Sequence, residues 1–554
     1  MAGFDESFDI VVVGSGGGGF CAALTALDAG RSVLVLESTD MVGGSTAMSG
    51  GALWVPNNPL QAKAGVKDSR DASLTYIQAL NTHDNSALRQ RRDAAFVDEA
   101  SEMVSFLMRR GVPLERCEGW SDYHDELPGG SVRGRSLSAK FFDLRKLGDW
   151  ASRLRRGAAP FPLKWPEFAM LPLVKRTARA KFYAARLGLR LTKMKITGAQ
   201  LVGMGTALQG RMLKEILDAG GEIRTDSPVN DLVRNDSGRV TGVIAEIDGK
   251  TRRIEARLGV IVAAGGFAHN QQMRDEHGPK PAHADWTHAN PGDTGSMLSV
   301  MMKHGAATDM MDNAIWLVTS KLPSGYKIFH IDDIAKPHAI MVTPQGRRFT
   351  DESGSNYDNG RNMYAAGATP GWAILDSRHR DRYIWAGAMP GKTPPEWFES
   401  GYMKKAETIE ELARLCGMDQ AVLAETISRF NRAAETGVDD DFGRGARAYD
   451  RAWGDPTVRP NPVLGAISEA PFYAVQVFPG DVGTTGGVVI NEHGNVLDRE
   501  ENPIEGLYAA GNSTASIFGR TYPGAGATIA ATFTFGYVGV QHALRGAKEA
   551  KAAA

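Results

Sequence analysis

The chain has few cysteines and no long apolar run. Its three cysteines, Cys21, Cys117 and Cys416, are too few and too far apart for a disulfide framework or a CxxC metal site. No apolar run approaches the roughly 18 residues of a membrane-spanning helix. The first residues lack the basic region and apolar stretch of a secretory signal. Because disulfides and a secretory signal are not indicated, we expect a cytoplasmic protein. The histidines show no metal-ligand spacing, so we expect no bound metal.

The sequence also has almost no net charge, with 63 Lys and Arg against 64 Asp and Glu. Nucleic-acid-binding proteins are normally basic overall, so this balance argues against a nucleic-acid partner. Glycine, by contrast, is abundant: 64 of 554 residues, well above the usual share of about 7%. The length predicts two to four domains, and the glycines indicate where the functional segments lie.

The first glycine cluster separates a predicted strand, residues 8–13, from a predicted helix, residues 20–29. Gly14, Gly16 and Gly19 match GxGxxG, and a second strand ends at Glu37. This strand–turn–helix context is typical of a dinucleotide-binding βαβ unit. Gly14 permits the tight turn, Gly16 lets the backbone approach a pyrophosphate, and Gly19 lets the helix pack closely. The carboxylate of Glu37 is the expected partner of the ribose hydroxyls.

Three further glycine-rich turns, at 42–51, 263–266 and 506–512, suit a long cofactor. We expect FAD extended across one discontinuous domain, since an NAD enzyme usually needs only the first turn. The predicted cofactor contacts are Gly14, Ser15, Gly16, Gly18, Gly19, Glu37, Ser38, Gly43, Gly44, Ser45, Thr46, Ser49, Gly50, Gly51, Val229, Ala263, Ala264, Gly265, Gly511, Asn512, Thr528 and Ile529.

Composition changes along the chain predict the domain boundaries. Residues 223–258 have the pattern of a small β-meander, and residues 283–470 contain more Pro, Trp and Met, with a predicted helix near 405–435. We therefore predict an α/β protein. A Rossmann-like FAD-binding domain, residues 1–282 and 471–554, carries an inserted α+β catalytic cap domain, residues 283–470.

Three segments resemble a known family: residues 44–56, 346–357 and 506–537, the last containing Thr-Tyr-Pro-Gly-Ala-Gly at 521–526. They are similar to the FAD-dependent 3-ketosteroid Δ1-dehydrogenases of the fumarate reductase/succinate dehydrogenase flavoprotein group. The resemblance implies desaturation between C1 and C2 of a 3-ketosteroid, with hydride passing to FAD and then to a quinone or similar acceptor. Ser45-Thr46-Ala47 supplies no histidine for a flavin linkage, so non-covalent FAD is expected.

The resemblance also implies the catalytic residues. Tyr522 and the backbone N–H of Gly526 would polarise the C3 carbonyl, and such donors contribute about 3 kcal/mol each. Tyr357 would take the C2 proton, with Tyr123 supporting it. Because three residues separate Ser353 from Tyr357, where about two are expected, Tyr364 remains an alternative base.

Other functions stay open. A 3-ketosteroid 4-dehydrogenase is one, a flavin-binding protein without turnover is another, and a fumarate-reductase-like dicarboxylate enzyme is a third. A dicarboxylate needs cationic partners, and Arg347, Arg348 and Arg520 are candidates. The aromatic and proline residues of 518–523 suit an apolar ketone better.

One segment, residues 153–195, is strongly basic: it holds twelve Lys or Arg and one acid, Glu167, leaving the rest of the chain acidic. Aromatic and apolar residues alternate with these cations, which is typical of a segment lying in an anionic membrane interface. We expect a peripheral contact with the inner face of the membrane there, or else a solvated basic surface or a subunit contact. The oligomeric state is left open.

Overall fold

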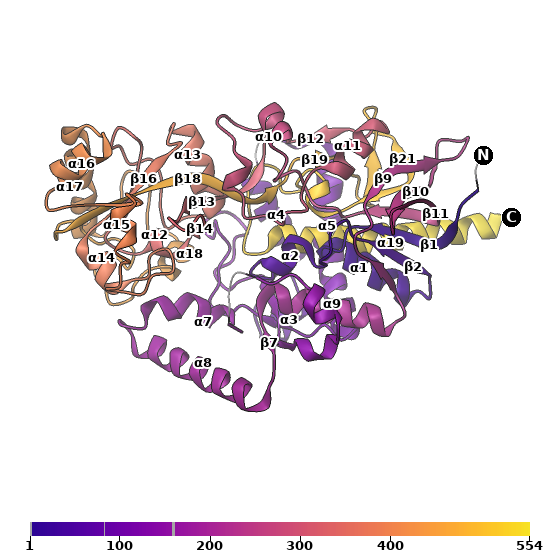
Figure 1. Ribbon diagram of the computed structural model, residues 1–554, viewed down its shortest axis with the longest axis horizontal. Helices are drawn as coiled ribbons and strands as arrows, with labels where there is room; N and C mark the ends of the chain where they lie inside the picture. Colours follow the sequence, from indigo (N-terminus) through magenta and orange to yellow (C-terminus); the bar gives the residue numbers. More distant parts are fainter. Residues whose placement is uncertain (1–2, 82–83, 158–160, 554) are drawn as a thin grey trace.

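The computed structural model describes residues 3–81, 84–157 and 161–553, whose two largest sheets lie beside each other (Figure 1). Residues 158–160 of the predicted basic segment, and residues 1–2 and 554 of the predicted FAD-binding domain, lie outside this description. The mixed α/β architecture agrees with the fold class expected from the sequence.

The larger sheet has eight strands in the order β20-β21-β11-β1-β2-β8, with β10 paired to β11 and β9 paired to β10. β1 pairs in parallel with β2 and β11, and β11 with β21. Residues 10–13 of β1 are buried, as expected for a parallel strand covered on both faces. The strands are β1 (Glu6–Val13), β2 (Val33–Leu36), β8 (Glu222–Arg224), β9 (Val229–Arg234), β10 (Val240–Ile247), β11 (Lys250–Val262), β20 (Asn495–Leu497) and β21 (Pro503–Ala509).

Helices from distant parts of the sequence cover this sheet. α1 packs against β1 and β2, and α19 packs against α1 and α5. Their bounds, with those of neighbouring helices, are α1 (Gly17–Asp28), α2 (Gly44–Met48), α3 (Pro59–Lys63), α4 (Arg70–Leu80), α5 (Ala87–Arg109), α9 (Met204–Asp218), α10 (Gln271–His277), α11 (Ser296–Lys303) and α19 (Ala527–Ala553). Short strands on this side are β3 (Ala52–Trp54), β4 (Leu114–Arg116), β5 (Ser136–Ala139), β6 (Phe142–Asp143), β7 (Leu201–Val202), β12 (Thr308–Asp309) and β19 (Gly487–Val488).

The smaller sheet has six antiparallel strands, in the order β14-β13-β18-β16-β15, with β17 paired to β18. They are β13 (Ala314–Lys321), β14 (Lys327–His330), β15 (Ala339–Val342), β16 (Gly371–Leu375), β17 (Met403–Ala406) and β18 (Phe472–Thr484). The helices around it are α12 (Asp332–Ala335), α13 (Asn356–Ala365), α14 (Ser377–Arg382), α15 (Glu396–Glu399), α16 (Ile409–Cys416), α17 (Gln420–Thr436) and α18 (Ala448–Ala452).

The segments that build each of the two large sheets begin and end at other residues than the predicted domain boundaries. Met297, Leu298 and Met301 of α11 belong to the large core, although the sequence assigned residues from 283 to the second domain. β18 lies at the centre of the smaller sheet, although residues from 471 were assigned to the first domain. The reason is that strand-like and apolar patterns do not specify which sheet receives them. The helix expected near 405–435 is two helices, because Gly417 ends α16 with φ of 71°.

The basic segment folds into a helical hairpin beside the main body. It follows α6 (Trp150–Arg153) and consists of α7 (Trp165–Met170) and the longer α8 (Ala178–Thr197), which lies at the lower left edge of Figure 1. The hydroxyl of Thr177 caps α8 by accepting from the N–H of Ala180, at 3.1 Å. The carboxylate of Glu167 is buried and pairs with Arg190 at 2.6 Å, which fixes α8 against α7.

Candidate active site

A single cavity of about 1110 Å³ reaches from the first glycine turn to the smaller sheet. All of the predicted cofactor contacts line it except Gly19 and Gly43, which lie behind its wall. The four predicted catalytic residues, Tyr123, Tyr357, Tyr522 and Gly526, line it as well. Nucleotide-binding and catalytic candidates therefore share one chamber.

The first glycine turn has the geometry of a pyrophosphate cradle. Gly14 has φ of +98°, and a Cβ there would overlap the carbonyl of Ala263. A Cβ at Gly19 would overlap the carbonyl of Gly14, so this glycine lets α1 pack onto the turn. At Gly16 the nearest atom to an added Cβ is the Ala263 oxygen, at 3.8 Å, so the backbone there faces the open cavity. The start of α1 thus offers N–H groups to an anionic ligand.

Glu37 lies at the cavity wall at the end of β2. Its Oε2 accepts from the Ser15 hydroxyl at 2.6 Å, and its Oε1 accepts from the N–H and hydroxyl of Thr39 at 3.0 and 2.9 Å. These contacts fix the carboxylate where a ribose would be held. The hydroxyl of Ser15 also accepts from the N–H of Gly43 at 3.1 Å, which explains why Gly43 lies behind the wall.

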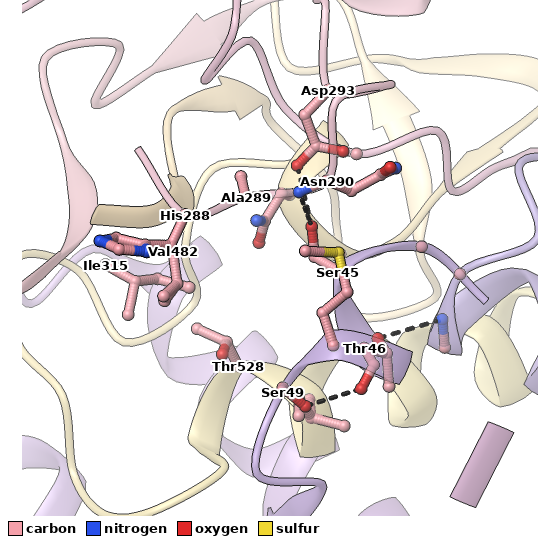
Figure 2. Close-up of a pocket in the computed structure, with 18 of the residues that line it drawn as sticks. Ser45, Thr46, Ser49, His288, Ala289, Asn290, Asp293, Ile315, Val482 and Thr528 are labelled. Atoms are coloured by element: carbon pink, nitrogen blue, oxygen red, sulfur yellow. Dashed lines mark hydrogen bonds between the residues drawn. The ribbon is translucent and has the colours of Figure 1, made fainter. Parts of the chain in front are cut away.

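The second glycine segment meets a loop that the sequence analysis did not single out. In Figure 2 the hydroxyl of Ser45 points at residues 289–293; it accepts from the N–H of Asn290 at 2.9 Å and donates to Asp293 at 3.3 Å. Burial raises the pKa of Asp293 to about 7. Residues 290–295, Asn-Pro-Gly-Asp-Thr-Gly, form a turn-rich sequence that resembles the other cofactor-contacting turns, and this was the available signal.

His288, another lining residue missed by the sequence analysis, is held by the smaller sheet. Its Nε2 lies 2.6 Å from the hydroxyl of Thr319, whose own proton is donated to the carbonyl of Ile328 at 2.8 Å. The Nε2 therefore carries the ring proton. Burial lowers the pKa of His288 to about 4, so the ring is neutral at pH 7.

Three predicted tyrosines form a row along one side of the cavity. The ring of Tyr522 lies between those of Tyr123 and Tyr357, with centroids 5.6 and 6.2 Å away and interplanar angles of 28° and 27°. Tyr449 extends the row, with its centroid 4.4 Å from that of Tyr123. Tyr449 was not predicted, because its sequence context carries no motif. Burial is the main cause that raises the pKa of each of these four phenols.

The turn that carries Tyr522 and Gly526 is fixed from several sides. The carbonyl of Pro523 accepts from the Tyr76 hydroxyl at 2.7 Å and from the N–H of Tyr123 at 3.0 Å. Gly526 has φ of +89°, and a Cβ there would overlap the carbonyl of Ala52. The hydroxyl of Tyr522 lies 3.1 Å from that of Thr528. Hydrogen bonding from Thr528 and from the N–H of Gly526 opposes the rise in the pKa of Tyr522 that burial causes.

Tyr357 and Tyr364, the two candidate bases, lie in different surroundings. Tyr357 lines the cavity, is 3% exposed, and donates its hydroxyl to Oδ1 of Asn313 at 2.8 Å. Tyr364 packs against Trp316 and donates to the carbonyl of Pro281 at 3.2 Å, away from the cavity. The sequence analysis expected the hydroxyl of Tyr123 to support Tyr357; in the structure the hydroxyl of Tyr357 donates to Asn313.

Beyond the tyrosines the cavity is walled by aromatic rings. Trp120 contacts Trp165 and Trp453, with centroids 4.9 and 5.0 Å away. Trp165 and Phe168 come from α7, so the basic hairpin supplies part of this wall. Pockets lined in this way bind apolar ligands through a small number of polar groups.

The arginines considered for a dicarboxylate lie elsewhere. Arg348 is buried between Glu352 and Asp439, and Arg520 pairs with Asp312 at 2.7 Å. Arg347 is exposed at the surface. Each of the two paired guanidinium groups is already matched by a carboxylate of the chain.

The sequence and the fold are both similar to those of known flavin-dependent dehydrogenases. The family model described as FAD binding domain matches residues 9–529. The 3-oxosteroid 1-dehydrogenase of Mycolicibacterium smegmatis is 40% identical, over 96% of each chain. The 4-oxocyclohex-2-ene-1-carboxylate 5-dehydrogenase of Sinomonas cyclohexanicum is 34% identical, over 96% of this chain and 92% of that one. The crystal structure of 3-ketosteroid Δ1-dehydrogenase from Sterolibacterium denitrificans, in complex with 1,4-androstadiene-3,17-dione, superposes with a TM-score of 0.92 at 33% identity, over 98% and 100% of the two chains.

Proposed function

The chain belongs to the FAD-binding family of 3-ketosteroid Δ1-dehydrogenases, and from this premise we propose that it introduces the C1–C2 double bond of 3-ketosteroids. The observation that carries the proposal is the convergence of Tyr522, Gly526 and Tyr357 on one cavity that also contains the nucleotide cradle. The family resemblance expected from residues 521–526 is thereby confirmed.

The cavity suits FAD at its cradle end. The open backbone at Gly16, the fixed carboxylate of Glu37 and the start of α19 would hold the pyrophosphate, ribose and isoalloxazine respectively. FAD supplies the hydride acceptor for C1. We further propose that it is bound non-covalently, because the short helix at 44–48 presents Ser45 and Thr46 where a linking histidine would be needed. Acid precipitation would then release the flavin into the supernatant, whereas flavin retained in the pellet would contradict this.

Residues of the chain would polarise the C3 carbonyl, accept the C2 proton and orient the steroid. Tyr522 and the N–H of Gly526 donate to the C3 oxygen, where negative charge develops as the C2 proton leaves. Tyr357, across the row of rings from Tyr123, accepts that proton. The aromatic wall of Trp120, Trp165 and Trp453 excludes water and orients the flat, apolar ring system.

The proposal is tested by anaerobic reduction of the bound flavin, with product analysis. We expect androst-4-ene-3,17-dione to bleach the flavin and to yield the 1,4-diene. A 5α-saturated 3-ketosteroid that gains a 4,5 double bond would instead indicate a 4-dehydrogenase. Bleaching by 4-oxocyclohexanecarboxylate alone would indicate a small-ring substrate, and no bleaching by any ketone would indicate a protein without turnover. Fumarate should not reoxidise the reduced flavin.

Reoxidation of the reduced flavin by an electron acceptor is the next step of the cycle. We propose a quinone, since an apolar acceptor can enter the same aromatic chamber after the steroid leaves. Stopped-flow reoxidation of the reduced enzyme by menadione should then slow when androstadienedione occupies the cavity. A rate independent of that product would contradict a shared chamber.

We also propose that α8 contacts an anionic membrane surface. Phe182, Leu189 and Ile196 are 59%, 72% and 80% exposed. They are spaced by seven residues, two helical turns, and so share one face. Five exposed cations of the same helix make no salt bridge within the described residues: Arg179, Lys181, Arg186, Lys193 and Lys195. Each such cation contributes about 1 kcal/mol near an anionic leaflet.

The inner face of α8 strengthens this assignment. Tyr183, Leu187 and Leu191 are partly covered and share a helix face with the buried Ala180, so the outer apolar face is a second one, not the core face. α7 in turn lines the substrate chamber with Trp165 and Phe168. A bilayer in contact with α8 would therefore lie close to the aromatic wall that α7 contributes to the chamber. No helix within the described ranges is long and apolar enough to span a membrane.

Vesicle co-sedimentation tests this contact. We expect binding to phosphatidylcholine vesicles that contain phosphatidylglycerol, weakened by salt and by the triple change Phe182→Ser, Leu189→Ser and Ile196→Ser. Val438→Ser, at a site 59% exposed beside the smaller sheet, is the matched control. Equal sedimentation of the triple variant and the control would contradict the proposal, and a concentration-dependent dimer lost in the triple variant would assign α8 to a subunit contact.

A further inference from the structure

Asn313 lies directly before β13, with its side chain buried between two hydroxyl groups. Oδ1 accepts from the hydroxyl of Tyr357 at 2.8 Å, and Nδ2 donates to the hydroxyl of Thr485 at 3.0 Å. Its backbone is held at both ends, because its N–H donates to Met310 and its carbonyl accepts from Thr485 at 3.0 Å. Asn313 is 3% exposed, so its amide is shielded from bulk solvent.

This arrangement satisfies the neutral phenol but not its anion. A base at this position must exist as a phenolate before it accepts a proton, and burial raises the pKa of Tyr357 to about 12. A phenolate accepts hydrogen bonds and donates none, so it would face the Oδ1 of Asn313 as an oxygen against an oxygen. An amide carries an acceptor and a donor on opposite arms, and half a rotation about its Cβ–Cγ bond exchanges them.

We propose that Asn313 is a positioning residue that holds Tyr357 in both protonation states by turning its amide. With Oδ1 toward the ring it accepts from the phenol, and with Nδ2 toward the ring it donates to the phenolate. The hydroxyl of Thr485 can bond to the other arm of the amide in both orientations. It accepts from Nδ2 when Oδ1 faces the phenol, and it donates to Oδ1 when Nδ2 faces the phenolate. The inference rests on the proposed function, in which Tyr357 takes the C2 proton.

The proton and electron pairs balance in this scheme. The C2–H bond breaks, its proton forms the O–H bond of Tyr357, and the electron pair develops as an enolate on the C3 oxygen, held by Tyr522 and Gly526. Bound FAD would accept the hydride from C1, and loss of that hydride would complete the C1–C2 double bond. Asn313 then accepts from the newly formed phenol through Oδ1.

The other charged groups around Tyr357 keep the same hydrogen-bonding character in both protonation states. The guanidinium of Arg361 lies over the ring, 5.7 Å from its centroid. Asp358, on the same helix, pairs with His124 at 3.3 Å, and Arg520 pairs with Asp312 at 2.7 Å. The two arginines lower the pKa of Tyr357 and Asp358 raises it, but none of these groups can switch between donor and acceptor.

The test measures the ionisation of residue 357 directly. 3,5-Difluorotyrosine, whose phenol is intrinsically more acidic, is placed at 357 in otherwise unchanged holoenzyme and in Asn313→Leu, Asn313→Asp and Thr485→Ser. Its phenolate absorbance is titrated against the same proteins with natural tyrosine. We expect the midpoint to rise by about one unit in Asn313→Leu, since a lost hydrogen bond to a charged group is worth about 1.5 kcal/mol. Asn313→Asp should raise it further, and Thr485→Ser should leave it unchanged.

A matched control separates this role from packing. Asn359 is a buried amide on the helix that carries Tyr357, and its Oδ1 accepts from Thr350 at 2.7 Å. Asn359→Leu should leave the midpoint where it is. An unchanged midpoint in Asn313→Leu, or an equal rise in Asn359→Leu, would overturn the proposal. The titration needs no steroid, so failure of the proposed function shows separately, as a flavin that no 3-ketosteroid bleaches in the unaltered enzyme.

A kinetic measurement gives the second readout. The rate of anaerobic flavin reduction by androst-4-ene-3,17-dione is followed against pH in the unaltered enzyme and in Asn313→Leu. We expect about a tenfold lower rate at pH 7, restored toward that of the unaltered enzyme as the pH rises, with the same steroid dissociation constant. A rate lowered equally at every pH would assign Asn313 to structure alone.

Discussion

Asp293 gives the sharpest test of the electrostatics of the cavity. Its carboxyl is buried against Gly265, where a Cβ would overlap Oδ1, and its one hydroxyl donor is Ser45 at 3.3 Å. Burial, with the negative charges of Glu37 and Asp481 nearby, raises its pKa to about 7. The pyrophosphate of bound FAD would act in the same direction, because it adds negative charge.

The sign of the effect on stability follows from proton binding. The carboxyl of an unfolded chain titrates near pH 4, so between about pH 4 and 7 the folded state binds one more proton than the unfolded state. This contribution is therefore full at low pH and is lost as the pH rises through 7. Between pH 5 and pH 8 the fall in the free energy of unfolding is about 3 kcal/mol.

The assay compares holoenzyme with the variant Asp293→Asn by thermal unfolding across that range. For a chain of this length the unfolding entropy is about 1.2 kcal/mol/K, so the Tm of the unaltered enzyme should fall by about 2 to 3 °C relative to the variant. His288, whose pKa is lowered to about 4, changes stability with pH in the opposite direction, but it is present in both proteins and cancels. Parallel Tm curves would refute the reasoning.

Three other changes test the site and the hairpin. Tyr522→Phe removes the phenolic donor, so stopped-flow flavin reduction should slow by about 100- to 1000-fold with unchanged flavin content; a smaller loss would mean that the tyrosine only packs. Gly526→Ala places a methyl group on the carbonyl of Ala52 at a positive φ, and should cost about 2 to 4 kcal/mol of stability, seen as a lower Tm and weaker FAD retention; an unchanged Tm would contradict the close approach. Glu167→Gln leaves the buried guanidinium of Arg190 without its carboxylate, and should speed tryptic cleavage of α8 while the global Tm changes little; unchanged cleavage would show that the ion pair does not fix the hairpin.

The nucleotide cradle could be predicted because its parts are neighbours in the sequence. A strand, three glycines, a helix and Glu37 lie within about 30 residues, and each glycine has a local steric reason: Gly14 in its positive φ, Gly19 in its contact with Gly14. The same holds for Tyr522 and Gly526, which share one turn. FAD, the family and the mixed α/β fold were predicted on these residues and are confirmed.

The domain boundaries could not be predicted from short-range sequence patterns. α11 carries Met297 and Met301 into the large core, although its composition resembles that of the following domain. β18 alternates like any half-buried strand, and only its pairing with β13 and β16 assigns it to the smaller sheet. Hydrophobic periodicity identifies an element, but the partner that covers its apolar face is chosen by the whole chain.

By itself, then, the sequence determined the cofactor, the family and the residues of each turn, because these depend on short-range backbone geometry. Only the tertiary structure decided what lies beside each candidate site residue: Asn313 and not Tyr123 at the hydroxyl of Tyr357, Asp293 beside Ser45, and aromatic rings of α7 in the wall of the chamber. Those contacts join residues tens to hundreds of positions apart, and no local pattern records them. The charges give a second example. The sequence sums to almost zero net charge, but the fold places a basic helix, α8, exposed along the edge of the molecule.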